Sequence, residues 1–544
     1  MRGMMMDQPL LITGLIRYAA RYHADTEIVT KTVEGPIHRY TYAAAYERIQ
    51  QLAHALVELG VQPGDRLATM AWNGYRHFEL YYAISGIGAV CHTVNPRLFA
   101  QQIEYILNHA EDRYVFVDQT FVPLLEQLAP KLKSVKGYVV LTDAAHMPKS
   151  TLPNLICYEE LIRDRPQHYD WPSFDEWTAS SLCYTSGTTG SPKGVLYSHR
   201  STLLHTLSVN QADSLAFTAR DSVLPVVPLF HVNAWGIPYA ATMAGAKLVF
   251  PGPHLDPASL WELIDGEQVT MTAGVPTIWF KLLEWLDQQG KRFTSLKRVL
   301  AGGSAVPISI ISAFEEKHGA RVCHAWGMTE ISPVGTKGML KAAQEKLPPE
   351  ERYRVQASQG RAMFGVELKI VDADGNELPH DGKAFGNLLV RGPFVTAGYF
   401  NDPEASKAAF DKEGWFRTGD VVTIDADGWV RIVDRTKDLI KSGGEWISSI
   451  DLENAAVGHP DVMEAAAIAV PHPKWQERPV LVVVLKPGAA LTRDEMLRYL
   501  GDKVAKWSLP DDVVFVAELP HTATGKLLKS KLREQFRSHH LQSA

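Results

Sequence analysis

Residues 180–194 have the sequence SSLCYTSGTTGSPKG, an apolar run followed by hydroxyl side chains, glycines and one lysine. Small residues let a backbone wrap closely around phosphate oxygens, which hydroxyl groups and a lysine ammonium can bind. The spacing is not GxxxxGK[ST], because Ser191 and Pro192 separate Gly190 from Lys193. A flexible Ser/Thr/Gly linker is the alternative. The density of hydroxyl residues directly after a strand-like run favours a phosphate-binding loop in an α/β fold.

The sequence on both sides of this loop alternates between helical and strand patterns. TYAAAYERIQQLAHALVELG (41–60) has helical periodicity, whereas RLATMA (66–71), YVFVD (114–118) and RVCHAWG (321–327) are apolar, strand-like runs. Several of these runs end in glycine-rich or polar turns. This alternation predicts a large N-terminal domain of stacked α/β sheets.

The pattern changes twice towards the C-terminus. After about residue 360, two D-x-D-G turns lie between alternating runs, which predicts a β-rich subdomain at 360–434. From 435 to 544, strands such as VLVVVL mix with helical stretches such as TRDEMLRYLGDKVA, which predicts a small α+β domain. We therefore expect a large domain at 1–434, with the boundary in DRTKD at 434–438.

Composition excludes several classes of protein. With 46% hydrophobic and 21% charged residues, a net charge of −6 and a pI near 6.4, the chain has no basic field for nucleic acid. Its four scattered cysteines predict reduced thiols in a cytoplasmic protein. The N-terminal segment suggests an amphipathic helix without a signal peptide, and no apolar run reaches the roughly 18 residues of a transmembrane segment.

Four further motifs follow the loop: AWGMTE at 325–330, WFRTGD at 415–420, DRTKDLIKSGG at 434–444 and TGK at 524–526. Together with the loop, their order and spacing resemble the adenylate-forming (AMP-binding) superfamily, which includes acyl-CoA synthetases, peptide-synthetase adenylation domains and firefly luciferase. Shared strings such as SHRST, FHVNAWG and SGGEWIS are similar to bacterial medium-chain fatty acid:CoA ligases and to 3-methylmercaptopropionate:CoA ligases. The resemblance covers the chain from about 184 to 529.

The motif residues also have chemical roles of their own. Trp326 can stack on adenine, and Glu330 offers the hard oxygen ligand that Mg²⁺ requires. Asp420 can accept hydrogen bonds from both ribose hydroxyls. Attack of a carboxylate on the α-phosphate brings two anions together, so a cation such as Lys526 is needed as charge builds. Each of these residues, taken alone, has a structural alternative: a core tryptophan, a solvated aspartate or a surface lysine.

The resemblance implies a complete set of site residues with ATP, Mg²⁺ and coenzyme A as cofactors. Thr185 and Glu330 would hold the metal, and the catalytic set would be Lys526, Thr185, Glu330 and His231. Nucleotide and cofactor binding would involve Thr185, Ser186, Gly187, Thr188, Thr189, Gly190, Lys193, Gly303, His324, Ala325, Trp326, Thr329, Asp420, Arg435, Lys437, Lys441 and Trp446. The acid would meet His231, Val232, Trp235 and Gly303, with Trp235 as the gate of the acyl channel.

The implied activity is that of an ATP-dependent, AMP-forming acid:CoA ligase. In the family, the small C-terminal domain is mobile: it rotates about a hinge, here Lys437, exchanging Lys526 for the loop from Lys441 to Trp446. We expect short-to-medium straight-chain acids as substrates and, as an alternative, 3-methylmercaptopropionate from dimethylsulfoniopropionate degradation. The resemblance also implies a homodimer.

Other functions are less consistent with the sequence. A serine hydrolase would carry GxSxG, which is absent, and the GxGxxG of a dinucleotide site fails at Cys91. A peptide-synthetase module would continue into a carrier domain, and only about 15 residues follow Lys529. Luciferase chemistry stays open. A non-catalytic adenylate-binding regulator is the alternative from another class, and it would be expected to lack Lys526 or Glu330.

Overall fold

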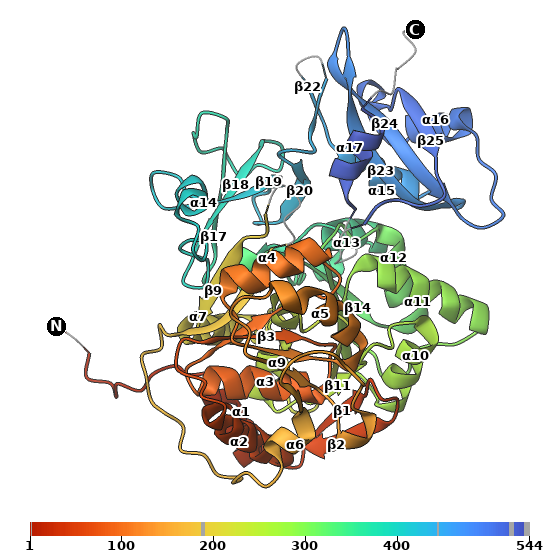
Figure 1. Ribbon diagram of the computed structural model, residues 1–544. Helices are drawn as coiled ribbons and strands as arrows, with labels where there is room; N and C mark the ends of the chain where they lie inside the picture. Colours follow the sequence, from red (N-terminus) through yellow and green to blue (C-terminus); the bar gives the residue numbers. More distant parts are fainter. Residues whose placement is uncertain (2, 186–190, 443–444, 522–526, 538–544) are drawn as a thin grey trace.

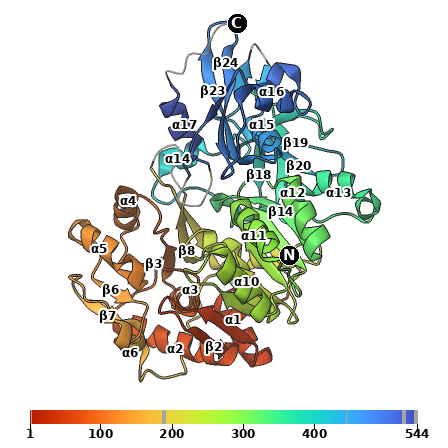
Figure 2. The same ribbon diagram turned by 90° about the vertical axis from the view of Figure 1, so that its right-hand side faces the viewer.

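The computed structural model describes residues 1, 3–185, 191–442, 445–521 and 527–537 (Figure 1). A large lobe carries a smaller C-terminal lobe above it, as the view in Figure 2 also shows. Two large sheets form the core of the large lobe, a four-stranded sheet lies at its upper edge, and a five-stranded sheet forms the small lobe. This arrangement confirms the predicted fold class.

The nine-stranded sheet has the order β16-β15-β14-β13-β12-β10-β11-β1-β2. Its central strands are parallel, whereas β2, β15 and β16 are antiparallel to their neighbours. Its strands are β1 (Glu27–Lys31), β2 (Ile37–Thr41), β10 (Ser222–Pro225), β11 (Lys247–Phe250), β12 (Met271–Gly274), β13 (Arg298–Gly302), β14 (Arg321–Gly327), β15 (Val334–Lys337) and β16 (Arg361–Ala362).

The seven-stranded sheet has the order β7-β6-β5-β3-β4-β8-β9 and is parallel except for β9. Its strands are β3 (Arg66–Met70), β4 (Val90–Thr93), β5 (Tyr114–Val117), β6 (Gly137–Val140), β7 (Leu155–Cys157), β8 (Ala179–Tyr184) and β9 (Gly194–Ser198). Parallel strands covered on both faces are almost continuously apolar, which is why runs such as YVFV are recognisable in the sequence.

Helices separate and cover the two large sheets. Every residue of α3 is buried, and α3 contacts strands of both sheets, so it belongs to a shared central layer. One outer layer covers the seven-stranded sheet with α4 and α5, and the other covers the nine-stranded sheet with α10 to α13. The helices of the large lobe are α1 (Thr13–Tyr22), α2 (Tyr42–Glu58), α3 (Tyr75–Gly86), α4 (Ala100–Ala110), α5 (Val122–Leu128), α6 (Tyr158–Ile162), α7 (His199–Val209), α8 (Val232–Trp235), α9 (Ile237–Ala244), α10 (Pro257–Gly266), α11 (Pro276–Gln289), α12 (Ile308–Ser312), α13 (Pro349–Gln356) and α14 (Pro403–Ala408).

The four-stranded antiparallel sheet contains β17 (Glu367–Val371), β18 (Phe385–Arg391), β19 (Phe416–Ile424) and β20 (Val430–Arg435). Both D-x-D-G turns lie here. Asp372 accepts the N–H groups of Asp374 and Asn376, and Asp425 accepts those of Asp427 and Trp429. Such side-chain-to-backbone bonds close a tight turn, as the sequence indicated.

The small lobe begins at β21, after a connection at residues 436–439. Its sheet contains β21 (Ile440–Ser442), β22 (Glu445–Ile447), β23 (Val462–His472), β24 (Gln476–Leu485) and β25 (Asp512–Phe515), and its helices are α15 (Ser449–Val457), α16 (Arg493–Gly501) and α17 (Lys529–Gln535). A capping box at Thr492 and Glu495 begins α16. Among the described helices, none combines the length and hydropathy needed to cross a bilayer.

Candidate active site

A cavity of about 1070 Å³ lies where the carboxyl ends of the large-lobe strands face the small lobe. Ligands of open α/β sheets bind at such strand ends. Most of the predicted site residues that the structure describes line this cavity: Thr185, Lys193, His231, Val232, Trp235, Gly303, Ala325, Trp326, Thr329, Glu330, Arg435 and Lys437.

Thr185 follows β8 directly, and its contacts with Lys193 hold the two ends of the predicted phosphate loop together. The Thr185 N–H donates to the Lys193 carbonyl oxygen at 2.9 Å, and the Lys193 N–H donates to Thr185 Oγ1 at 3.1 Å. Ser186, Gly187, Thr188, Thr189 and Gly190 lie outside the described residues. These two hydrogen bonds hold the described ends of the loop together, and both Thr185 and Lys193 line the cavity.

Glu330 is the buried acid of the cavity, with 5% of its surface exposed. The Tyr399 hydroxyl donates to Glu330 Oε1 at 2.8 Å. Burial raises the pKa of Glu330, and Tyr399, Arg435 and Lys193 partly offset that rise. A buried carboxylate in the same cavity as the Thr185 hydroxyl fits the hard oxygen donors that Mg²⁺ requires.

Trp326, Asp420 and Arg435 form a bonded group on one wall. Trp326 Nε1–H donates to Asp420 Oδ2 at 2.8 Å, and Arg435 Nε lies 2.7 Å from Asp420 Oδ1. Asp420 is 1% exposed, so the carboxylate is fixed between an aromatic ring and a cation that both line the cavity. Trp326 and Arg435 present a flat ring and a positive charge to the cavity, whereas Asp420 holds both of them without lining the cavity itself.

The segment at Val232–Gly236 makes a left-handed turn, with φ values of 45°, 51°, 48°, 59° and 76°. Left-handed backbone costs about 1–2 kcal/mol for each non-glycine residue. Asn233 helps to hold it, because its Nδ2 donates to Ser181 Oγ at 3.0 Å and its Oδ1 accepts from Cys183 Sγ at 3.5 Å. Strain of this kind, retained by surrounding contacts, is typical of functional segments.

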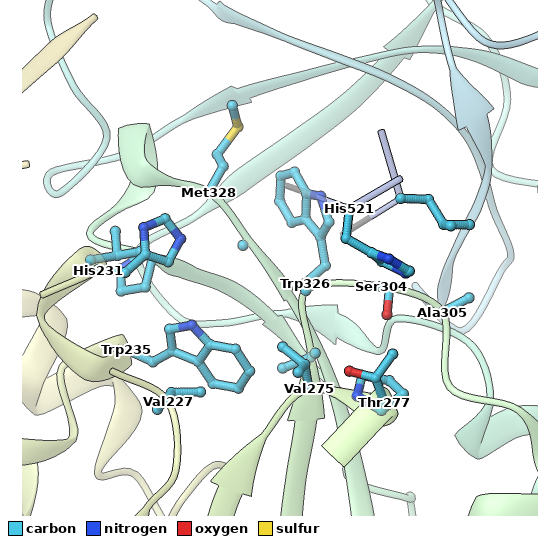
Figure 3. Close-up of a pocket in the computed structure, with 18 of the residues that line it drawn as sticks. Val227, His231, Trp235, Val275, Thr277, Ser304, Ala305, Trp326, Met328 and His521 are labelled. Atoms are coloured by element: carbon cyan, nitrogen blue, oxygen red, sulfur yellow. The ribbon is translucent and has the colours of Figure 1, made fainter. Parts of the chain in front are cut away.

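This turn directs Trp235 across the strand ends. Figure 3 shows the indole between Val227 and Val275, with His231 beside it. A Cβ at Gly302 would meet the Ala325 carbonyl oxygen at 2.8 Å and Trp235 Cη2 at 3.4 Å. Only glycine therefore allows the close approach of the indole and of β14 to this strand end.

Four of the predicted residues that the structure describes do not line the cavity: the buried Asp420 of the group just described, and three others whose contacts lie elsewhere. His324 is buried, its Nδ1–H donates to the Ala357 carbonyl oxygen at 3.0 Å, and burial lowers its pKa to about 4. Lys441 and Trp446 are paired across β21 and β22, with Lys441 Nζ 4.7 Å from the centre of the indole ring. None of the three lines the cavity in this arrangement of the lobes.

The small lobe contributes its own residues to the cavity, among them His521 and Leu527, which flank the segment containing Lys526. Lys526 itself lies outside the described residues. Figure 3 shows His521 facing Trp326 and Ser304, and His521 Nε2 lies 3.6 Å from Glu464 Oε2. Burial lowers the pKa of Lys437 in the connection between the lobes.

Tyr399 and His521 are among the cavity residues that sequence reasoning missed. Tyr399 bonds to Glu330, and Lys193 Nζ lies 4.9 Å from the centre of its ring. Nothing in AGYFND marks this tyrosine, because its partners lie far away in the sequence. His521 lies five residues before Lys526, and the basic ring next to TATGK was the available signal.

A family model described as AMP-binding enzyme matches residues 16–400, and one described as AMP-binding enzyme C-terminal domain matches residues 451–526. The chain belongs to this family of AMP-binding enzymes. It is 52% identical to a 3-methylmercaptopropionyl-CoA ligase of Ruegeria lacuscaerulensis over 99% of both chains. It is 50% identical to a medium-chain-fatty-acid–CoA ligase of Ectopseudomonas oleovorans over 98% of both.

Solved structures of related enzymes share the fold of this chain. The anthranilate CoA ligase AuaEII in complex with anthranoyl-AMP has a TM-score of 0.86 at 26% identity, covering 97% of this chain and 98% of that one. ATP-bound MatB from Rhodopseudomonas palustris has a TM-score of 0.81 at 26% identity, covering 96% and 99%. Together these comparisons confirm the predicted family and the expectation of an AMP-forming acid:CoA ligase.

Proposed function

We propose that this enzyme activates short-to-medium straight-chain carboxylic acids as acyl-adenylates and transfers the acyl group to coenzyme A. The supporting observation is a single cavity that brings Lys193, Glu330 and Trp235 of the large lobe together with the residues next to Lys526 of the small lobe. The residues proposed to bind phosphate (Lys193) and metal (Glu330) thus line the same cavity as Trp235, which would contact the apolar chain of the acid.

The first step, formation of the acyl-adenylate, uses the cations Lys193 and Lys526 and the buried Glu330. ATP binds with its phosphates at Thr185 and Lys193 and its ribose at Asp420. Thr185 and Glu330 would hold Mg²⁺, which would supply positive charge to the phosphates. The acid enters beside Trp235, with its carboxylate towards His231. Lys526 stabilises the charge that builds at the α-phosphate while pyrophosphate leaves.

The second step requires another orientation of the small lobe. We propose that the lobe boundary lies within 434–438, and that the small lobe turns about Lys437, carrying Lys526 away and bringing Lys441 and Trp446 to the cavity. Coenzyme A then attacks the acyl carbon and AMP is released. The orientation seen here, with His521 and Leu527 at the cavity, supports assignment to the adenylating step.

The Trp235 indole lies in the cavity near Val227, Val275 and Gly302, and its bulk there supports a preference for acids shorter than palmitate. The second candidate substrate, 3-methylmercaptopropionate, is favoured by the relative in Ruegeria lacuscaerulensis. Comparing kcat/KM for 3-methylmercaptopropionate, butanoate, octanoate and palmitate tests the proposal. A maximum at palmitate, or no turnover of any of the four acids, would contradict it.

We also propose a cytoplasmic homodimer. The four cysteines are free and buried, which suits a reducing compartment. The dimer follows from the family resemblance, and light scattering coupled to size-exclusion chromatography tests it. A monomer mass near 60.4 kDa at micromolar concentration would contradict the dimer.

A further inference from the structure

The two lobes have separate hydrophobic cores. Among the described residues, the apolar clusters of the large lobe contain no residue beyond 432, and those of the small lobe begin at Ile440. The chain crosses between the lobes at residues 436–439 (Figures 1 and 2). Lobes without a shared apolar core can change their relative orientation, so polar contacts decide which orientation is populated.

One buried polar cluster crosses this boundary. Asp434 of β20 is 1% exposed and belongs to the large lobe. Its Oδ2 accepts the Ser449 N–H at 2.7 Å and the Ser449 hydroxyl at 2.5 Å. Ser449 is the first residue of α15 in the small lobe, so this contact joins the last strand of one lobe to the first helix of the other.

The cluster continues to the helix that follows Lys526. Lys529 Nζ donates to Ser449 Oγ at 2.5 Å and lies 2.6 Å from Glu453 Oε1. Burial disfavours the ammonium form, but the carboxylates of Glu453 and Asp434 outweigh it and raise the pKa of Lys529. One ammonium therefore serves two carboxylates, the buried Asp434 of the large lobe and the mostly buried Glu453 of the small lobe, with Ser449 between Asp434 and Lys529.

A second contact between β20 and α15 is an ion pair that is far more exposed. Arg431 of β20 and Asp451 of α15 lie 2.7 Å apart, but their side chains are 62% and 45% exposed. Exposed pairs contribute little to stability, whereas removing one member of a buried cluster leaves the others without a partner. Asp451 is therefore a suitable control for Asp434 at the same boundary.

We propose that Asp434 is a positioning residue that holds the small lobe in the adenylating orientation through Ser449 and Lys529. The cluster fixes the start of α17, three residues after Lys526, while Asp434, Glu453 and Lys529 themselves line the cavity. Breaking the Asp434 contact frees the small lobe for the second step. This inference rests on the two-step function proposed above.

The test separates the two half-reactions. Asp434→Ala is expected to lower the rate of acyl-adenylate formation at least tenfold while changing thioester formation from supplied acyl-AMP less than threefold. Asp434→Asn keeps an acceptor for Ser449 and is expected to fall between the alanine variant and the unmodified enzyme. Asp451→Ala should leave both steps within twofold. Equal losses in both half-reactions, or no loss in adenylation, would overturn the proposal.

A second readout needs no turnover. Because the native cysteines are buried, spin labels at Ala145→Cys and Asp502→Cys, both exposed positions, report the distance between the lobes. With a non-hydrolysable ATP analogue, Asp434→Ala should add a second distance population that the unmodified chain lacks. Ser449→Ala should do the same if Asp434→Ala does not fold. A single unchanged distance in a folded variant refutes the positioning role of Asp434. Failure of the unmodified enzyme to release pyrophosphate with any acid refutes the proposed function instead.

Discussion

Replacing Trp235 by alanine is expected to shift the substrate preference of the enzyme towards acids with longer chains. The indole lies between Val227 and Val275 and approaches the end of β13 at Gly302 (Figure 3). Its removal opens apolar space where the longer chain of palmitate can be buried. The left-handed turn that positions residue 235 is held by Asn233, so the backbone should keep its course.

The size of the effect follows from buried methylene groups. Each one contributes about 0.8 kcal/mol, and about 1.4 kcal/mol corresponds to a tenfold change. If two additional methylenes of palmitate occupy the vacated space, the gain is about 1.6 kcal/mol, or roughly fifteenfold. The ratio of kcat/KM for palmitate to that for octanoate should therefore rise at least about tenfold. Butanoate should change little, because it does not reach the opened space.

Pyrophosphate release with each acid provides the assay. Trp177→Ala is the matched control, because Trp177 is 68% exposed and does not line the cavity. An unchanged palmitate-to-octanoate ratio in a folded Trp235→Ala enzyme would show that this indole does not limit chain length. The same shift in Trp177→Ala would have the same meaning.

Three further outcomes are expected. Lys526→Ala should lower acyl-adenylate formation at least a hundredfold yet leave thioester formation from supplied acyl-AMP nearly unchanged; equal losses in stopped-flow assays of both steps would argue against this division. Asp420→Ala should weaken AMP binding in calorimetry by about 1.5–3 kcal/mol, the loss of charge-assisted hydrogen bonds; unchanged affinity would exclude the ribose role. Because burial raises the pKa of Glu330, protonation should compete with Mg²⁺ as pH falls, starting at a higher pH than for an exposed glutamate; a metal titration that is flat down to pH 5 would contradict this.

The fold was predictable because its signals are local. Buried parallel strands are short apolar runs, and Asp372 and Asp425 mark turns whose hydrogen bonds form within four residues. The prediction of a phosphate loop rests on the same kind of signal, since its small and hydroxyl residues are consecutive. Such features depend little on the rest of the chain.

Tertiary features were not predictable in the same way. A positive φ is ordinary for Gly236, yet the four residues before it share that conformation, against their own preference. Asn233 retains the turn through Ser181 and Cys183, about 50 residues away in the sequence. The Tyr399 contact with Glu330 and the His324 contact with Ala357 likewise join distant segments. No local pattern encodes these pairs.

The proposed function requires that a carboxylate oxygen of the acid bonds to the α-phosphorus of ATP. The most direct test uses an acid whose carboxylate carries a heavy oxygen isotope, followed by mass spectrometry of the AMP released on thioester formation. One labelled oxygen in AMP for each thioester formed is expected. AMP that carries no label would contradict an acyl-adenylate intermediate.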